Sequence, residues 1–341
     1  MNRAFDASQQ SRPCYAVDME VMSPPSDTVS DMTYGLLQNQ FFLTAGSWDG
    51  TVSVWSIDDR GNANAEFRFE HQAPVLSVTQ MDGVVYSAGC DQIIRGWDLT
   101  SQQAAELGAH DAPIQVIRAI EEISSLATVS WDATFRLTDI RNPAQPQVVQ
   151  LPEKPVAMDA KSNLLVVAYG ERGLAQFDLR NPSQPVETLV SSHELITSCV
   201  GIAHDLSGYS YGSVEGRVHI NYLSNRANSF PFRCHRINQQ GQPSECYGVT
   251  CVTYNPQTGH LATTGGDGTF VFWDHLKKTR IRPSDRTDNT ITWGCFSPDA
   301  RFFTYAVSYD WSKGANSELR NKPHRIFTHV MTQQDTTINR R

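Results

Sequence analysis

Long apolar runs are missing from this 341-residue chain. No stretch of about 18 apolar residues is present that could cross a bilayer as a helix. The first residues, MNRAFDASQQSRP, also lack the apolar core of about 7 to 15 residues that a secretory signal needs. We therefore expect a soluble protein that works inside the cell.

Signatures of catalysis are missing too. The sequence contains neither the GxSxG turn that exposes a nucleophilic serine nor the GxxxxGK(S/T) loop that binds phosphates. Most histidines and aspartates are explained by the repeat described below, so the sequence gives no separate indication of a Ser-His-Asp triad. We predict that the protein is not an enzyme, with no catalytic residue and no cofactor.

Paired cysteines are also absent. The seven cysteines, at positions 14, 90, 199, 234, 246, 251 and 295, are odd in number and scattered, which indicates a reducing compartment. Cys234, His235, Cys246 and Cys251 come closest to a metal-binding set. Their spacing lacks the CxxC pairs of structural zinc sites, so we predict no metal site.

Positive charge is scarce in the first half of the chain. Residues 1–170 carry 10 Lys and Arg against 21 Asp and Glu, residues 171–341 carry 18 against 15, and the net charge is −8. The densest basic segment, HLKKTRIRPSDR, fits either a solvated loop or a footprint for an acidic peptide or RNA backbone. Without an aromatic platform for single strands, direct RNA binding should be weak and salt-sensitive. The cations of this basic segment (275–286) are Lys277, Lys278, Arg280, Arg282 and Arg286.

A repeat of about 40 residues organises the chain. Each copy places an acidic residue in a tight turn before a strand-like segment, as in GSWDGTVSVW (46–55) and GGDGTFVFWD (265–274). Successive acids are 39 to 52 residues apart, which is close to the length of a four-stranded WD-repeat blade. We predict an all-β fold, a seven-bladed WD-repeat β-propeller. The turn acids are Asp49, Asp91, Asp132, Glu171, Glu215, Asp267 and Asp310.

The physical basis of the repeat is burial. Alternation from Thr51 to Trp55 gives a strand with two differently packed faces, and one sheet cannot bury both of them alone. Seven sheets around an axis can bury them on one another. His71, His110 and His193 precede their turn acids by 20 to 22 residues. Because WD repeats use such a histidine to hold the turn acid by a hydrogen bond, we interpret these three as structural.

Closing the ring requires a strand from the N-terminus. The last blade should use residues 289–296, 302–308 and 324–330, and YAVDMEV (15–21) alternates suitably for its outer strand. We therefore expect a disordered segment at 1–12, a propeller over 13–331 and a flexible polar tail at 332–341.

Several segments together resemble a known family. They are EVMSPPSDTVS (20–30), GSWDGTVSVW, SVEGRVHI (213–220), FRCHR (232–236) and SYDWSKG (308–314). Nearly the whole chain is similar to the mRNA-export WD-repeat factors of the nuclear pore, the Rae/Gle type. SVEGRV and CHR are shared with the Bub-type mitotic checkpoint relatives, whereas DWSKG distinguishes the export factors.

The resemblance implies a partner-binding site on one face of the propeller. Rigid aromatic anchors and arginines that clamp carboxylates suit such a site. One alternative to partner binding stays open for Glu215, which could cap its own turn. Trp131 stands at the same repeat position as Trp48, but we expect it to pack between blades. Ala315 stands where the family has a histidine. The implied partner-binding residues are Trp48, Glu215, Arg217, Arg233, His235, Arg236, Asp310, Trp311 and Lys313.

The resemblance also implies what the protein does. It predicts a non-enzymatic adaptor in mRNA export that binds the Gle-binding-sequence peptide of an FG nucleoporin, with mRNA or mRNP bound directly or indirectly. We expect it in the nucleus and at the nuclear pore of the nuclear envelope, with some cytoplasmic pool, without membrane insertion and without homo-oligomers. The alternative is a kinetochore checkpoint scaffold that binds peptides of kinases.

Overall fold

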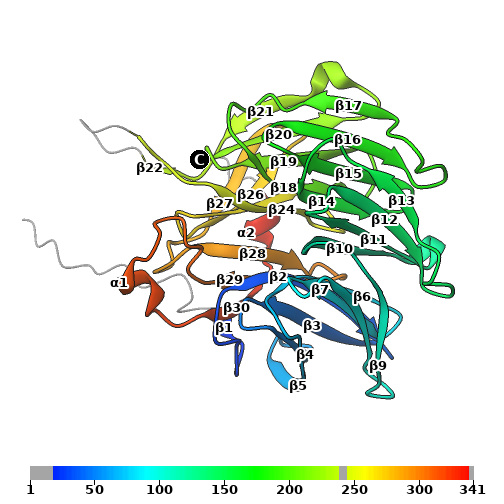
Figure 1. Ribbon diagram of the computed structural model, residues 1–341. Helices are drawn as coiled ribbons and strands as arrows, with labels where there is room; N and C mark the ends of the chain where they lie inside the picture. Colours follow the sequence, from blue (N-terminus) through cyan, green and yellow to red (C-terminus); the bar gives the residue numbers. More distant parts are fainter. Residues whose placement is uncertain (1–17, 238–243, 338–341) are drawn as a thin grey trace, which may run out of the picture.

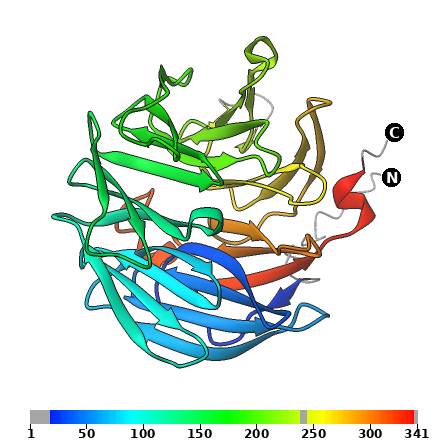
Figure 2. The same ribbon diagram turned by 90° about the vertical axis from the view of Figure 1, so that its right-hand side faces the viewer.

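Seven four-stranded antiparallel sheets form a ring in the computed structural model, which describes residues 18–237 and 244–337. In Figure 2 the colours run around this ring from blue through green to red. The predicted seven-bladed β-propeller is thus confirmed, and six blades follow the chain order from the innermost strand outward. No helix in the described ranges is both long enough and apolar enough to traverse a bilayer.

The strands are assigned to blades as follows. Blade 1 contains β2 (Val29–Leu37), β3 (Gln40–Ser47), β4 (Thr51–Ile57) and β5 (Ala63–Glu70), and blade 2 contains β6 (Val75–Met81), β7 (Val84–Gly89), β8 (Ile93–Asp98) and β9 (Ala104–Ala109). Blade 3 contains β10 (Ile114–Ile120), β11 (Ser125–Ser130), β12 (Thr134–Asp139) and β13 (Gln147–Gln150), and blade 4 contains β14 (Pro155–Lys161), β15 (Leu164–Tyr169), β16 (Gly173–Asp178) and β17 (Glu187–Val190). Blade 5 contains β18 (Thr197–Ile202), β19 (Gly208–Ser213), β20 (Arg217–Tyr222) and β21 (Phe230–Arg233), and blade 6 contains β24 (Val249–Tyr254), β25 (Leu261–Gly265), β26 (Phe270–Asp274) and β27 (Thr279–Pro283). Blade 7 contains β28 (Ile291–Phe296), β29 (Phe302–Val307), β30 (Arg325–Val330) and β1 (Met19–Glu20).

The remaining elements are short. A separate two-stranded sheet pairs β22 (Arg236–Ile237) with β23 (Glu245–Cys246). Helices α1 (Ser317–Arg320) and α2 (Gln333–Thr336) and the 3₁₀ turns η2 (Glu121–Ile123) and η3 (Arg226–Asn228) lie in connections or near the C-terminus.

The ring closes as expected, by an N-terminal strand. Met19 and Glu20 pair with Thr328 and Phe327, and the Val21 amide donates to the Ile326 carbonyl at 2.8 Å. The first part of the expected strand (15–17) and the expected disordered segment (1–12) lie outside the described residues.

The expected flexible tail at 332–341 is folded as far as residue 337, and this corrects the predicted boundary. Thr332 and Asp335 cap α2 reciprocally, and Asp335 is 1% exposed. Its carboxylate receives a hydrogen bond from Arg282 at 3.2 Å and lies 3.3 Å from His329 Nε2. The sequence did not predict that α2 packs on blades 6 and 7, because polar side chains make these contacts and leave no apolar pattern. Residues 338–341 lie outside the described part.

The apolar core lies between neighbouring blades rather than within any one of them. At the junction of blades 1 and 7, Val29 and Trp55 pack with Phe302 and Ile326, and each is at most 1% exposed. Burial of side chains of this size contributes about 1.5 to 3 kcal/mol each. An isolated blade would leave these faces in water, so the blades stabilise one another.

Histidines hold the turns of three blades. Nδ1 of His71, His110 and His235 lies 2.9, 3.0 and 2.9 Å from the turn acids Asp91, Asp132 and Asp267, respectively. Burial alone would raise the pKa of Asp91, but hydrogen bonds from His71 and Arg95 lower it to about 2. The structural interpretation of His71 and His110 therefore holds.

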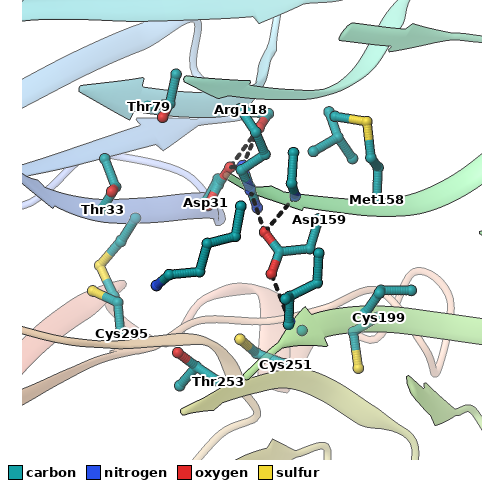
Figure 3. A pocket seen from close by; sticks show the side chains of 18 of the residues that line it. Asp31, Thr33, Thr79, Arg118, Met158, Asp159, Cys199, Cys251, Thr253 and Cys295 are labelled. Carbon is teal, nitrogen blue, oxygen red and sulfur yellow. Dashed lines mark hydrogen bonds and ion pairs between the residues drawn. The ribbon is translucent and has the colours of Figure 1, made fainter. Parts of the chain in front are cut away.

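Arg118 crosses the central channel from blade 3. Figure 3 shows it between Asp31 and Asp159: its Nη1 donates to Asp31 Oδ2 at 2.9 Å, and its Nε lies 3.6 Å from Asp159 Oδ1. The guanidinium also lies over the Trp293 ring, 5.8 Å from its centre. These groups line a cavity of about 490 Å³. Burial opposes the charge of Arg118, but the two carboxylates outweigh it and raise its pKa. One side chain thus connects blades 1, 3, 4 and 7.

Replacing Arg118 with methionine should destabilise the fold, because buried Asp31 and partly buried Asp159 would both lose their cation. We expect the free energy of unfolding to fall by about 3 to 5 kcal/mol in urea denaturation. The matched control is Arg141→Met, since that side chain is 72% exposed; its cost should stay within about 0.5 kcal/mol. Equal stability of the two variants would contradict the axial role of Arg118.

His329 should make the closure of the ring dependent on pH. Burial alone would lower its pKa, but hydrogen bonds to Asp18 and Asp335 raise it to about 9. Since the unfolded value is about 6.5, the stabilisation is complete below pH 6.5 and disappears as the pH rises through 9. We expect His329→Gln to lower the free energy of unfolding by about 2 to 3 kcal/mol at pH 6 and by almost nothing at pH 10. Urea titrations at both values measure this, and a cost independent of pH would refute it.

Candidate partner-binding face

The turns that carry the acids all emerge at one end of the ring. In an antiparallel blade the second strand ends there, and so does the fourth, which leads to the next blade. We call this end the turn-acid face. Both departures from the repeat extend from it: residues 308–324 between β29 and β30, and the segment between β21 and β24, of which residues 234–237 and 244–248 are described. In Figure 1, α1 and β22 project on the same side of the ring.

Two tryptophans at the same repeat position are exposed on this face. Trp48 is 48% exposed, where the sequence predicted an anchor. Trp131 is 39% exposed, and its indole Nε1 donates to Gln115 Oε1 at 2.8 Å. The expectation that Trp131 packs between blades is therefore wrong. Both tryptophans stand just before the turn acid, a position at which Tyr309 of blade 7 is 2% exposed, so the repeat position alone does not determine burial.

Glu215 joins its turn to the loop that enters blade 5. Its Oε1 accepts a hydrogen bond from the Glu194 amide at 2.9 Å, and its Oε2 lies 3.5 Å from Arg217 Nε. Of the two roles that the sequence left open, these contacts show neither: the carboxylate holds the preceding loop rather than its own turn. A contact of Glu215 with a partner stays a prediction.

Three arginines gather beside this turn. Arg217 and Arg233 stand directly opposite each other on β20 and β21, and Arg236 donates to the Glu215 carbonyl at 3.0 Å. Like charges at opposite strand positions destabilise a sheet. Buried Arg236 Nε has no hydrogen-bond partner among the described residues, and Arg217 Nε has only its 3.5 Å contact with Glu215. Among the described residues, these three neighbouring cations have one carboxylate contact, that of Arg217 with Glu215, and such a site favours a further anion.

His235 has a different place from the one predicted for it. Its imidazole is fully buried, with Nδ1 at 2.9 Å from Asp267 and Nε2 at 2.9 Å from Thr263 Oγ1. It is the structural histidine of blade 6, and we do not retain it as a partner contact. The sequence concealed this role because 32 residues separate His235 from Asp267. The inserted hairpin accounts for the additional length.

The long turn of blade 7 presents an aromatic and a basic side chain. Asp310 accepts hydrogen bonds from the amide and the hydroxyl of Ser312, at 3.1 and 2.7 Å, and so caps this turn. Trp311 is 46% exposed, and the Arg320 guanidinium lies 5.4 Å from its ring centre. Lys313 is also exposed. The predicted residues of DWSKG are thus on the turn-acid face, with Asp310 in a structural position.

The predicted basic segment does not form one patch. Lys277 and Lys278 follow β26 at the opposite end of the ring, where Lys277 pairs with Asp274 at 2.7 Å and Lys278 lies over the Phe230 ring. Arg280 and Arg282 lie on the outer strand β27, and Arg282 is paired with the helix α2. Arg286 alone lies on the turn-acid face, over the Tyr247 ring.

Metal ligands do not cluster either. Within 18–237 and 244–337, no three His, Cys, Asp or Glu side chains are arranged so that they could hold a metal ion. Burial raises the pKa of Cys199 to about 12 and that of Cys251 well above its usual value, so both thiols stay protonated.

Comparisons with known proteins agree with the WD-repeat propeller fold. The family model for the WD domain, G-beta repeat, matches residues 20–56 and 237–274. Among solved structures, the WD40 repeats of RRP9 superpose with a TM-score of 0.77 over 94% of this chain and 99% of that chain, at 14% identity, which shows the fold alone.

Curated relatives extend the comparison to the family. The mRNA export factor GLE2 of Chaetomium thermophilum is 35% identical, with 92% of this chain and 90% of that protein covered. The poly(A)+ RNA export protein of Schizosaccharomyces pombe is 34% identical, with 93% and 92% covered. Protein Rae1 of Drosophila melanogaster is 35% identical, with 91% and 93% covered. The chain therefore belongs to the Rae1/GLE2 family of mRNA export factors, which are non-enzymatic WD-repeat adaptors.

Proposed function

We propose that this protein is a nuclear pore adaptor in mRNA export that binds the Gle-binding-sequence peptide of an FG nucleoporin across its turn-acid face. The family supports a role in mRNA export and in nuclear transport. The proposal goes beyond this role in three respects: the protein binds the peptide, it is located at the pore in the nuclear envelope, and some of it is in the cytoplasm. Because the relatives are export factors, they favour this function over the checkpoint alternative.

The observation that carries the proposal is the arginine site of blade 5. Arg217 and Arg233 stand opposite each other beside the Glu215 turn, Arg236 donates to the Glu215 backbone carbonyl, and Arg217 contacts the Glu215 carboxylate, which also accepts the Glu194 amide. A carboxylate from a partner would relieve the repulsion and accept hydrogen bonds from guanidinium groups that are already positioned. Hydrogen bonds to charged groups contribute about 1.5 to 3 kcal/mol each.

Aromatic anchors extend the proposed interface toward blades 1 and 7. Trp48 and Trp311 are both about half exposed on the turn-acid face. The two blades are joined here: Thr28, just before the first strand of blade 1, donates its hydroxyl hydrogen to the carbonyl of Tyr309, two residues before Trp311, at 2.7 Å. Exposed tryptophan on a rigid turn gives a large contact area at little cost in conformational entropy. A peptide that reaches from the arginines to this pair would cross the ring.

Charge reversal of the arginine site tests the proposal. We expect Arg217→Glu combined with Arg236→Glu to weaken binding of a fluorescein-labelled Gle-binding-sequence peptide by at least 100-fold in fluorescence anisotropy, because attraction becomes repulsion. Arg141→Glu, an exposed arginine at the opposite end of the ring, is the matched control and should bind within twofold of wild type. Undiminished binding by the double variant, with an unchanged thermal midpoint, would refute the site.

Direct RNA contact is the weaker part of the proposal. The basic segment is divided between two ends of the ring and partly paired with carboxylates, so only a few phosphates could be neutralised at once. We expect unstructured RNA to bind with micromolar or weaker affinity, and the affinity to fall with a shallow slope between 50 and 200 mM salt. Titration at several salt concentrations measures the slope; a steep one would require a continuous footprint that this arrangement lacks.

A further inference from the structure

Blade 5 is held differently at the turn-acid face from the blades that have a histidine and an aspartate. His193 Nδ1 lies 3.9 Å from Glu215 Oε1, whereas the equivalent distances in blades 2, 3 and 6 are 2.9 to 3.0 Å. The Glu215 carboxylate accepts the Glu194 amide, as Asp132 accepts that of Asp111 in blade 3, but unlike Asp132 it does not reach the imidazole as well. The histidine of this blade therefore lacks its usual hydrogen bond.

Other polar groups of the same turn are also unpaired. Ser213 and Thr197 are at most 1% exposed, yet their hydroxyls and His193 Nδ1 have no hydrogen-bond partner in the described part of the chain. In blades 1 and 3 the serine at the position of Ser213 donates to the inter-blade loop: Ser47 to the Asp27 carbonyl and Ser130 to the Ala112 carbonyl. Unpaired buried polar groups cost about 1 to 3 kcal/mol each. The loop that enters blade 5, residues 191–196, keeps the bond from Glu194 to the turn acid but lacks the histidine and serine bonds that its counterpart in blade 3 has.

This loop presents apolar side chains to water. Leu195, Ile196 and Val214 are each about half exposed, and the Val214 amide donates to the Ile196 carbonyl at 3.2 Å, so the three are neighbours. Val214 is next to Glu215 and three residues from Arg217. An apolar surface is thus adjacent to a site with surplus positive charge.

We infer that the loop at 191–196 is an adaptive docking segment, which receives an apolar side chain of the bound peptide on Leu195, Ile196 and Val214. The inference rests on the proposed function and adds the chemistry of the peptide: an apolar residue close in sequence to an acidic one. The acidic residue follows from charge complementarity, because Arg217, Arg233 and Arg236 outnumber the neighbouring carboxylates of Glu194 and Glu215. Because the loop lacks two of the bonds that its counterpart in blade 3 has, it can adjust to the apolar residue.

Removing the apolar surface tests the contact itself. We expect Leu195→Ser combined with Ile196→Ser to weaken binding of the fluorescein-labelled Gle-binding-sequence peptide at least tenfold. Leu276→Ser is the matched control, because Leu276 is an exposed leucine at the opposite end of the ring; it should bind like wild type. If wild type fails to bind the peptide, the proposed function fails. If wild type binds and the double variant binds equally well, the inference alone is overturned.

Glu215→Asp tests whether the loop must adapt. An aspartate would place its carboxylate as in blades 2, 3 and 6 and restore the bond to His193. We expect slower amide hydrogen exchange over residues 191–196 and peptide binding weaker by at least threefold, because the loop is then fixed before the peptide arrives. Slower exchange with unchanged affinity would show that adaptation plays no part in docking, and would overturn this part of the inference.

Discussion

A four-stranded sheet that is apolar on both faces cannot exist alone in water, and every other feature of this protein depends on closing seven of them into a ring. Closure joins the two ends of the chain. Met19 and Glu20 add the last strand to blade 7, and His329 lies between Asp18 and Asp335, which come from opposite ends of the sequence. Since each blade buries its neighbours, a defect at this junction would expose apolar surface in blades 1 and 7 together.

Closure also explains why the turn-acid face suits the proposed binding. The acids and histidines fix the turns of the blades, so the residue that precedes each acid has a fixed direction. Trp48, Trp131 and Val214 are exposed at this position, whereas Tyr309 is buried there. A rigid frame with freely variable tips is suited to partner binding, because the backbone pays no ordering cost when the partner arrives.

The repeat made most of the fold predictable, and long-range contacts limited the rest. Spaced acids predicted seven blades, and alternation near residues 15–21 predicted the closing strand. Arg118 was not predictable, because a side chain that crosses the axis to Asp31 and Asp159 leaves no periodic signal. His235 could have been found: subtracting the polar insertion after it restores the spacing of about 22 residues to Asp267. The exposure of Trp131 was not predictable from its repeat position, because Tyr309 is buried at the same position.

The segment FRCHR joins a structural histidine to two arginines of the proposed binding site. Cys234 and His235 are buried, and His235 adopts a positive φ of 48° while its ring packs on Gly265, where a Cβ would approach within 2.4 Å. Because His235 is fixed in this way, it positions Arg233 and half-buried Arg236 beside the Glu215 turn. Substitution of His235 would therefore disturb both arginines, although its imidazole contacts Asp267 and Thr263 rather than the surface.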